Sequence, residues 1–67
     1  MDLLRTERTF ISAERARKFL FKQLDEAGIS PAEARYLIAV NVEGRFAPVL
    51  VGERYIPFAH HGITVVG

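Results

Sequence analysis

Apolar residues recur every three or four positions between residues 12 and 27, which is the spacing that one face of an α-helix requires. Ser12 stands where a helix N-cap is expected, because its hydroxyl can accept a free backbone amide of the first turn. Gly28 suits the C-terminal cap, since glycine enters the left-handed conformation without strain. The apolar stripe consists of Ala13, Ala16, Leu20, Leu24 and Ala27, with Phe19 and Phe21 on its flanks. The sequence therefore predicts a long amphipathic helix over 12–27.

A second, shorter helical signal follows this helix. Ser30 at a cap position, Pro31 at the first helical position and Glu33 three residues after the serine form a capping box with a proline. This pattern predicts a short helical turn near 31–35. The next segment, "YLIAVNV" at 36–42, is rich in β-branched and aromatic residues and favours a strand over a continuation of the helix.

Two more β-branched runs complete the predicted sheet, at 45–51 and 63–66. Glu43 and Gly44 predict a two-residue hairpin loop before the first of them. Pro48 has no amide hydrogen, and under this loop its backbone points away from the preceding strand. If Gly52 and Glu53 also form a two-residue loop, Pro48 would have to point away from the third strand as well, and both cannot hold. A regular three-stranded meander is therefore not expected, and either a bulge intervenes or one side of the strand is free around Pro48.

The remaining segments carry weaker signals. Residues 1–5 are expected to be disordered, 6–11 to form a short strand, and 54–62 to be irregular or a short edge segment because of Pro57. The order of elements predicts one α+β domain spanning 1–67, in which the long helix packs on a small antiparallel sheet.

Both faces of the predicted strand at 36–42 are apolar, and the helix covers only one of them. The other face needs either a second protomer or the remaining chain folded over it. A domain below about 70–80 residues rarely has enough core of its own, and the chain has no cysteine for a disulfide. We therefore expect a homodimer. Residues expected to be buried on the second sheet face are Leu37, Ala39, Val49, Val51 and Val65.

The net charge of +1 would not by itself draw the chain to nucleic acid or to a membrane. The charge is uneven, however: residues 1–22 hold six basic and three acidic residues, and residues 23–67 hold three basic and five acidic ones. No apolar run approaches the roughly 18 residues of a membrane span, and the N-terminus lacks the apolar region of a signal peptide. These observations favour a cytoplasmic protein without membrane contact.

The segment "LFKQLDEAGISPAEARYL", 20–37, resembles a helix-turn-helix segment of bacterial DNA-binding proteins. The resemblance rests on the turn glycine Gly28, the apolar Ile29 and the Ser30 cap, with apolar residues at the helix-packing positions. It implies a second helix through 36–42, where a strand would instead favour an interaction module. The DNA contacts that the resemblance implies are Arg15, Lys18 and Lys22 on phosphates, and Arg35 and Tyr36 on a recognition helix.

The adjacent histidines His60 and His61 in "AHHG" are the first candidates for chemistry. Neighbouring residues on a strand point to opposite faces, so the pair could share a metal only from a turn. Zinc needs three or four ligands, and neither Glu53 nor Glu43 stands at a recognised ligand spacing. We therefore do not assign a metal site to these histidines and place them in a turn before Gly62.

No catalytic constellation accompanies the histidines. The two serines, Ser12 and Ser30, are explained as helix caps, and the glycines are scattered at turns instead of forming a phosphate-binding loop. We assign no catalytic, cofactor-binding or metal residue. The sequence favours a small, bacterial-type, non-enzymatic module that binds itself or another macromolecule. The alternative is a small DNA-binding regulator that uses 20–37.

Overall fold

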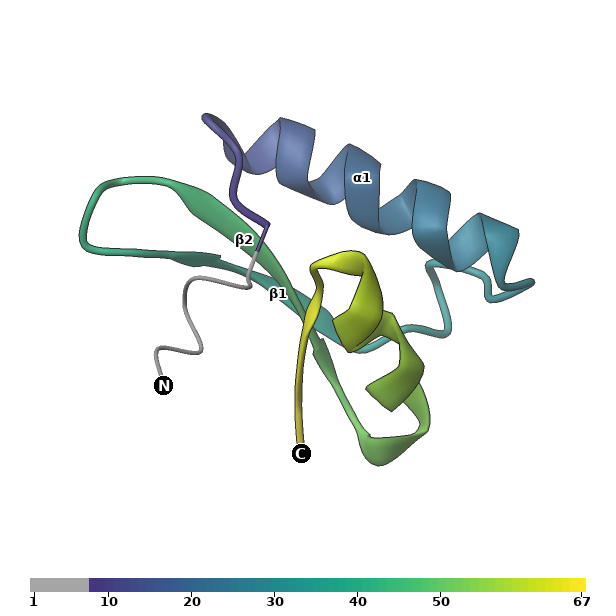
Figure 1. Cartoon of the computed structure of the whole chain (residues 1–67). Helices are drawn as coiled ribbons and strands as arrows, with labels where there is room; N and C mark the ends of the chain where they lie inside the picture. The colour runs from purple at the N-terminus through teal and green to yellow at the C-terminus, as the bar shows by residue number, and fades with distance from the viewer. Residues whose placement is uncertain (1–7) are drawn as a thin grey trace.

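Residues 8–67 are described by a computed structural model, in which two helical elements pack against one face of a three-stranded sheet (Figure 1). The elements in chain order are α1 (Ala13–Glu26), β1 (Tyr36–Val40), β2 (Phe46–Val51), the 3-10 helix η2 (Glu53–His61) and β3 (Thr64–Val66). The α+β prediction is confirmed. The expectation of disorder at 1–5 lies outside the described residues.

The bounds of α1 follow from local chemistry. The Ser12 hydroxyl accepts a hydrogen bond from the Arg15 amide at 3.2 Å, as expected of an N-cap. At the other end the Ile29 amide donates to the Leu24 carbonyl at 2.9 Å, and Gly28 adopts φ 75°, which together form a Schellman cap. Both predicted helix ends are confirmed. The side chains that α1 buries are Ala16, Leu20 and Leu24.

The predicted turn after α1 is a single turn at 31–33, and a strand follows it. The Glu33 amide donates to the Ser30 carbonyl at 2.9 Å, and the Ala34 amide donates to the Pro31 carbonyl at 3.3 Å. The chain then enters β1 at Tyr36 and leaves it at Val40, two residues before the predicted end. The second helix that the helix-turn-helix resemblance requires is therefore a strand in this structure.

The hairpin between β1 and β2 has a three-residue loop, not the predicted two-residue one. The Asn41 side chain accepts hydrogen bonds from the amides of Glu43 and Arg45, each at 2.9 Å, and Gly44 adopts φ 77°. This combination is typical of a turn closed by a glycine bulge. The prediction was wrong because it did not anticipate that Asn41 holds the turn, and the strand register shifts by one residue as a result.

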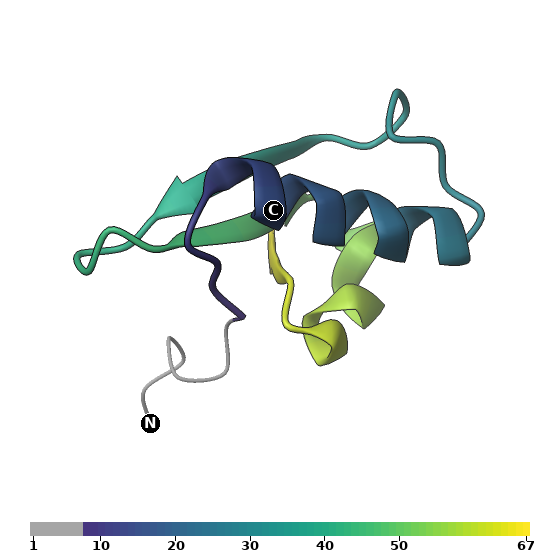
Figure 2. The ribbon, with the colours of Figure 1, turned by 90° about the horizontal axis from the view of Figure 1, so that it is seen from above.

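The third strand is parallel to β2, which corrects the expectation of an all-antiparallel sheet. Val49 lies beside Thr64, and Val51 lies beside Val66. Parallel neighbours need a crossover connection, and η2 supplies it where an irregular segment was predicted. Viewed from above, β1 and η2 lie on opposite sides of α1 (Figure 2).

Pro48 occupies the one stretch of β2 where an amide is not needed. Arg45 and Val51 bond towards β1, whereas Phe46 exchanges hydrogen bonds with Phe10 on the other side of β2. Successive residues alternate in direction, so Pro48 points away from β1, as predicted. On that side it falls between the Phe10 bridge and the start of β3. The Phe10 bridge is also the described part of the short strand predicted at 6–11.

The core lies between the sheet and the two helical elements. Its fully packed members are Leu20, Leu24, Leu50, Tyr55, Phe58 and Ile63. Val65 packs against this core, because its parallel pairing places it beside Leu50. The prediction that Val65 lies on the second sheet face was therefore wrong. The other four predicted residues of that face, Leu37, Ala39, Val49 and Val51, alternate with the core-facing positions and share the second face.

Candidate functional site

The outer edge of β1 presents unpaired backbone groups. The strand order is β1-β2-β3, so within residues 8–67 β1 pairs with β2 alone. The Arg35 carbonyl and the Asn41 amide are both directed at β2. By alternation, the amides and carbonyls of Tyr36, Ile38 and Val40 are directed away from β2. This edge therefore offers three donors and three acceptors in a row.

Apolar side chains are exposed on both faces of the same strand. Leu37 is 48% exposed on the second face, Val40 is 60% exposed on the helix-side face, and Val42 beyond the strand is fully exposed. The reason is the position of α1, which packs mainly over β2 and less over β1. β1 also contains no charged residue and no proline, the usual protections of a free edge. Its outer edge is a candidate interaction surface, which we call the β1 edge.

The second sheet face itself is less open than the sequence suggested. Ala47 and Val49 are already buried in the single chain, while Leu37 and Val66 remain about half exposed. Packing a partner on this face would cover Leu37 but would leave the core-side Val40 in solvent. A partner strand along the β1 edge would cover side chains on both faces.

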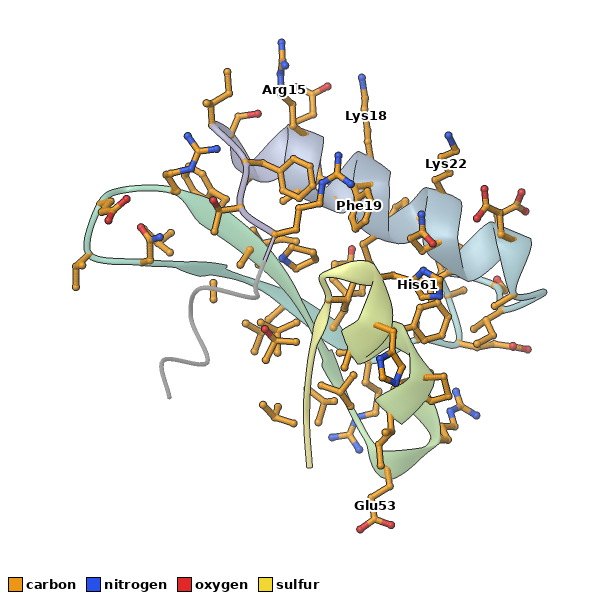
Figure 3. The ribbon with its side chains drawn as sticks, in the orientation of Figure 1. Arg15, Lys18, Phe19, Lys22, Glu53 and His61 are labelled. Atoms are coloured by element: carbon orange, nitrogen blue, oxygen red, sulfur yellow. The ribbon has the colours of Figure 1, made fainter. Side chains whose placement is uncertain are left out.

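The basic residues implied by the helix-turn-helix resemblance divide into two groups. Arg15, Lys18 and Lys22 project from the outer side of α1, away from the sheet, as Figure 3 shows. Lys18 also forms an exposed ion pair with Glu14 at 3.5 Å. Arg35 and Tyr36 lie at the start of β1 instead, and the Tyr36 ring packs edge-on against the Phe21 ring.

The two histidines are the last residues of η2 and both are exposed. Gly62 then caps the 3-10 helix at φ 82°, which matches the predicted turn before this glycine. Within the part of the chain that the structure describes, no three histidine, cysteine, aspartate or glutamate side chains come together as metal ligands. The His61 ring lies beside the Phe58 ring, with 6.1 Å between their centroids.

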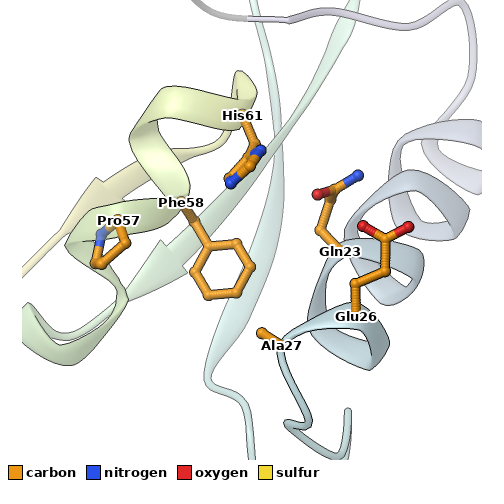
Figure 4. A pocket seen from close by; sticks show the side chains of 6 residues that line it. All are labelled: Gln23, Glu26, Ala27, Pro57, Phe58 and His61. Carbon is orange, nitrogen blue, oxygen red and sulfur yellow. The ribbon is translucent and has the colours of Figure 1, made fainter.

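His61 also lines a pocket of about 410 Å³ between α1 and η2. One wall comes from the last turns of α1 with Gln23, Glu26 and Ala27, and the other from η2 with Pro57, Phe58 and His61 (Figure 4). We call this cavity the α1–η2 pocket. The sequence did not indicate it, because an irregular 54–62 gave no reason to place Pro57, Phe58 and His61 on one wall.

The floor of the pocket is apolar and its rim is polar. Phe58 is 7% exposed and belongs to the core, and Ala27 and Pro57 add aliphatic surface. Gln23 and His61 approach each other across the opening, as Figure 4 shows, and Glu26 stands on the α1 side. This arrangement can hold a small molecule with an apolar body and a polar head.

No protein-family model matches this chain, and no curated protein or solved structure shows significant similarity to it. Among the described residues, no helix is long and apolar enough to cross a membrane.

Proposed function

We propose that the chain is a non-enzymatic interaction module that forms a homodimer through the β1 edge. In this dimer the two three-stranded sheets join into one continuous sheet. The observation that carries the proposal is a free, uncharged edge strand with apolar side chains exposed on both of its faces.

A second copy of the chain fits the β1 edge because the edge can complement itself. Two β1 strands run antiparallel across a two-fold axis at Ile38, so that Tyr36 lies opposite Val40 of the second copy. The outward-directed amides and carbonyls of the two copies can then form hydrogen bonds with each other, because they belong to the same three residues in both copies. Leu37 lies opposite Ala39 of the second copy, and both α1 helices lie on the same side of the joined sheet.

The small core also supports association. Among residues 8–67, ten residues are buried and all of them are apolar, and the chain has no cysteine. Cores of this size supply about 3–5 kcal/mol at most, so pairing of a further edge adds a substantial share of the stability. A joined sheet also removes the aggregation risk of an apolar edge.

The mass in solution tests this proposal. Sedimentation equilibrium should give twice the chain mass of 7.5 kDa at high concentration. Val40→Lys should weaken the dimer at least about tenfold, because the ammonium group must lose water at the joined edge. Ile56→Lys is the matched control, since Ile56 is 57% exposed in η2 and away from β1, and it should leave the mass unchanged. A monomer throughout the concentration range would refute the proposal.

Amide hydrogen exchange identifies the interface. The amides of Tyr36, Ile38 and Val40 should exchange more slowly as the protein concentration rises, because they gain partners only in the dimer. The amides of Leu37 and Ala39, which face β2, serve as internal controls and should change little. A dimer in which the first three amides stay unprotected would place the interface elsewhere.

The basic group on the outer side of α1 supports a second, independent proposal, which is binding to nucleic acid phosphates through Arg15, Lys18 and Lys22. Binding to mixed duplex DNA should then weaken steeply from low to moderate salt. Lys22→Gln should reduce both the affinity and the salt slope. Absence of salt-sensitive binding would remove this proposal.

A further inference from the structure

The C-terminal turn of α1 has an unfavourable distribution of charge. Asp25 and Glu26 are its last charged residues, and the last turn holds no basic residue. The C-terminus of a helix carries partial negative charge, so two carboxylates there repel it, while a cation would be stabilised. Among residues 8–67 the only ion pair within 4.0 Å joins Lys18 and Glu14, at the other end of the helix.

The same turn forms one wall of the α1–η2 pocket. Glu26 is one of the lining residues of the α1 wall, and Gln23, one turn earlier, contributes a side-chain carbonyl as an acceptor. The Phe58 ring and the Pro57 ring lie on the facing wall. The volume of about 410 Å³ lies within the range of small-molecule sites.

We propose that the α1–η2 pocket binds a small organic monocation, such as an amine with an aromatic or aliphatic body. The ammonium group contacts the Glu26 carboxylate and the Gln23 carbonyl oxygen, and the helix C-terminus adds to the attraction. The apolar body packs on Phe58, Pro57 and Ala27. An anion of the same shape is disfavoured, because it would meet Glu26 and the partial negative charge of the helix C-terminus.

Three probes of one shape and different charge test this inference. Benzylamine is a cation, benzyl alcohol is neutral and benzoate is an anion at neutral pH. In an NMR titration of the full chain, benzylamine should shift the amide signals of Gln23, Ala27 and His61 in a saturable way. Benzyl alcohol should bind at least about threefold more weakly, which is the range of an exposed ion pair, and benzoate should not bind. Equal affinity for all three, or no shift with benzylamine at millimolar concentration, would overturn the inference.

Variants of the pocket residues distinguish recognition of the ammonium group from apolar binding in the α1–η2 pocket. Glu26→Gln should weaken benzylamine about threefold to fivefold and leave benzyl alcohol unchanged. Glu14→Gln, which removes a carboxylate on the first turn of the same helix, is the matched control and should change neither. Ala27→Leu fills the space between the walls and should reduce both affinities, with circular dichroism confirming an unchanged fold. If Glu26→Gln leaves benzylamine binding intact, the charge assignment is wrong.

Discussion

The two sides of β2 are closed in different ways. On the side of β3, β2 pairs first with Phe10 and then with the parallel β3. Between these two partners lies Pro48, which has no amide to pair, and η2 lies next to β3. On the side of β1, the neighbouring strand is itself the edge of the sheet. Ile63 on the first side is 1% exposed, whereas Val40 on the second is 60% exposed.

This difference shows that strand composition does not determine burial. The segments "YLIAV" and "ITVV" are both rich in β-branched residues, and both were expected to be strands. In the second, Ile63 is buried and Val65 packs against the core, because η2 returns the chain over the core immediately before them. The first is left open because α1 lies mainly over β2. Substitutions at matched residues on the two sides therefore test whether the sides differ in stability.

The largest expected effect comes from removing a side chain of the packed core. Leu24→Ala should lower the free energy of unfolding by about 2–5 kcal/mol, because Leu24 is fully buried between α1 and the sheet. That loss is comparable with the whole stability of a chain of this length. Leu37→Ala, the matched substitution on β1, should cost about 1 kcal/mol or less, because half of the side chain is already in solvent.

Urea unfolding followed by circular dichroism measures both values. It should be done at low protein concentration, so that association adds little to either. Equal losses for the two leucine variants would mean that Leu37 is buried in solution and that the two sides do not differ.

The two left-handed glycines at the ends of these regions give a smaller effect. Gly62 follows η2 at φ 82°, and a Cβ there would lie 2.6 Å from the Arg8 Cβ. Gly44 in the hairpin loop has φ 77° and no atom within 4 Å of the added Cβ. Gly44→Ala should cost about 1–2 kcal/mol from backbone strain alone. Gly62→Ala should cost about 1 kcal/mol more, because the Arg8 segment must also move.

Thermal unfolding of the two alanine variants checks the difference. A Gly62 variant no less stable than the Gly44 variant would contradict the close packing of Arg8 against the η2 cap.

The features predicted correctly from the sequence depend on neighbouring residues. The N-cap at Ser12, the glycine cap at Gly28 and the turn after Ser30 are each set by groups within a few residues. The strand at 36–40 follows from a run of β-branched and aromatic residues. The direction of Pro48 was predicted by counting alternate positions from Arg45. The prediction holds although the loop length was wrong, because Arg45 still bonds towards β1 in the observed hairpin.

The features that were missed depend on segments far apart in the chain. The parallel direction of β3 and the inward position of Val65 follow from η2. The sequence of 54–62 did not predict this 3-10 helix, because Pro57 was interpreted as a residue that interrupts helices. The α1–η2 pocket needs residues 23–27 and 57–61 on facing walls, which only the packed fold provides. The exposure of the apolar side chains at the β1 edge likewise depends on the position of α1 over the sheet.

The smallest expected effects come from removing the polar side chains of Asn41 and Thr9, which form hydrogen bonds on opposite sides of β2. Asn41→Ala removes the acceptor of the Glu43 and Arg45 amides and should cost about 1 kcal/mol, since one of these amides is partly buried. Thr9→Val removes the hydroxyl that accepts from the Arg45 side chain at 2.8 Å on the opposite side of β2. It should cost about 0.5 kcal/mol, because the Arg45 guanidinium keeps its second bond to the Thr9 carbonyl.

Unfolding in urea gives the two losses, and amide exchange shows where each one acts. Asn41→Ala should speed exchange in the hairpin loop and at the Leu37 and Ala39 amides, which face β2, because the loop sets the register of that side. Thr9→Val should speed exchange at Phe10 and leave β1 unchanged, because its bond joins the N-terminal segment to the other side. If Thr9→Val also loosened β1, the two sides of β2 would unfold together, and the open edge would be no less stable than the closed one.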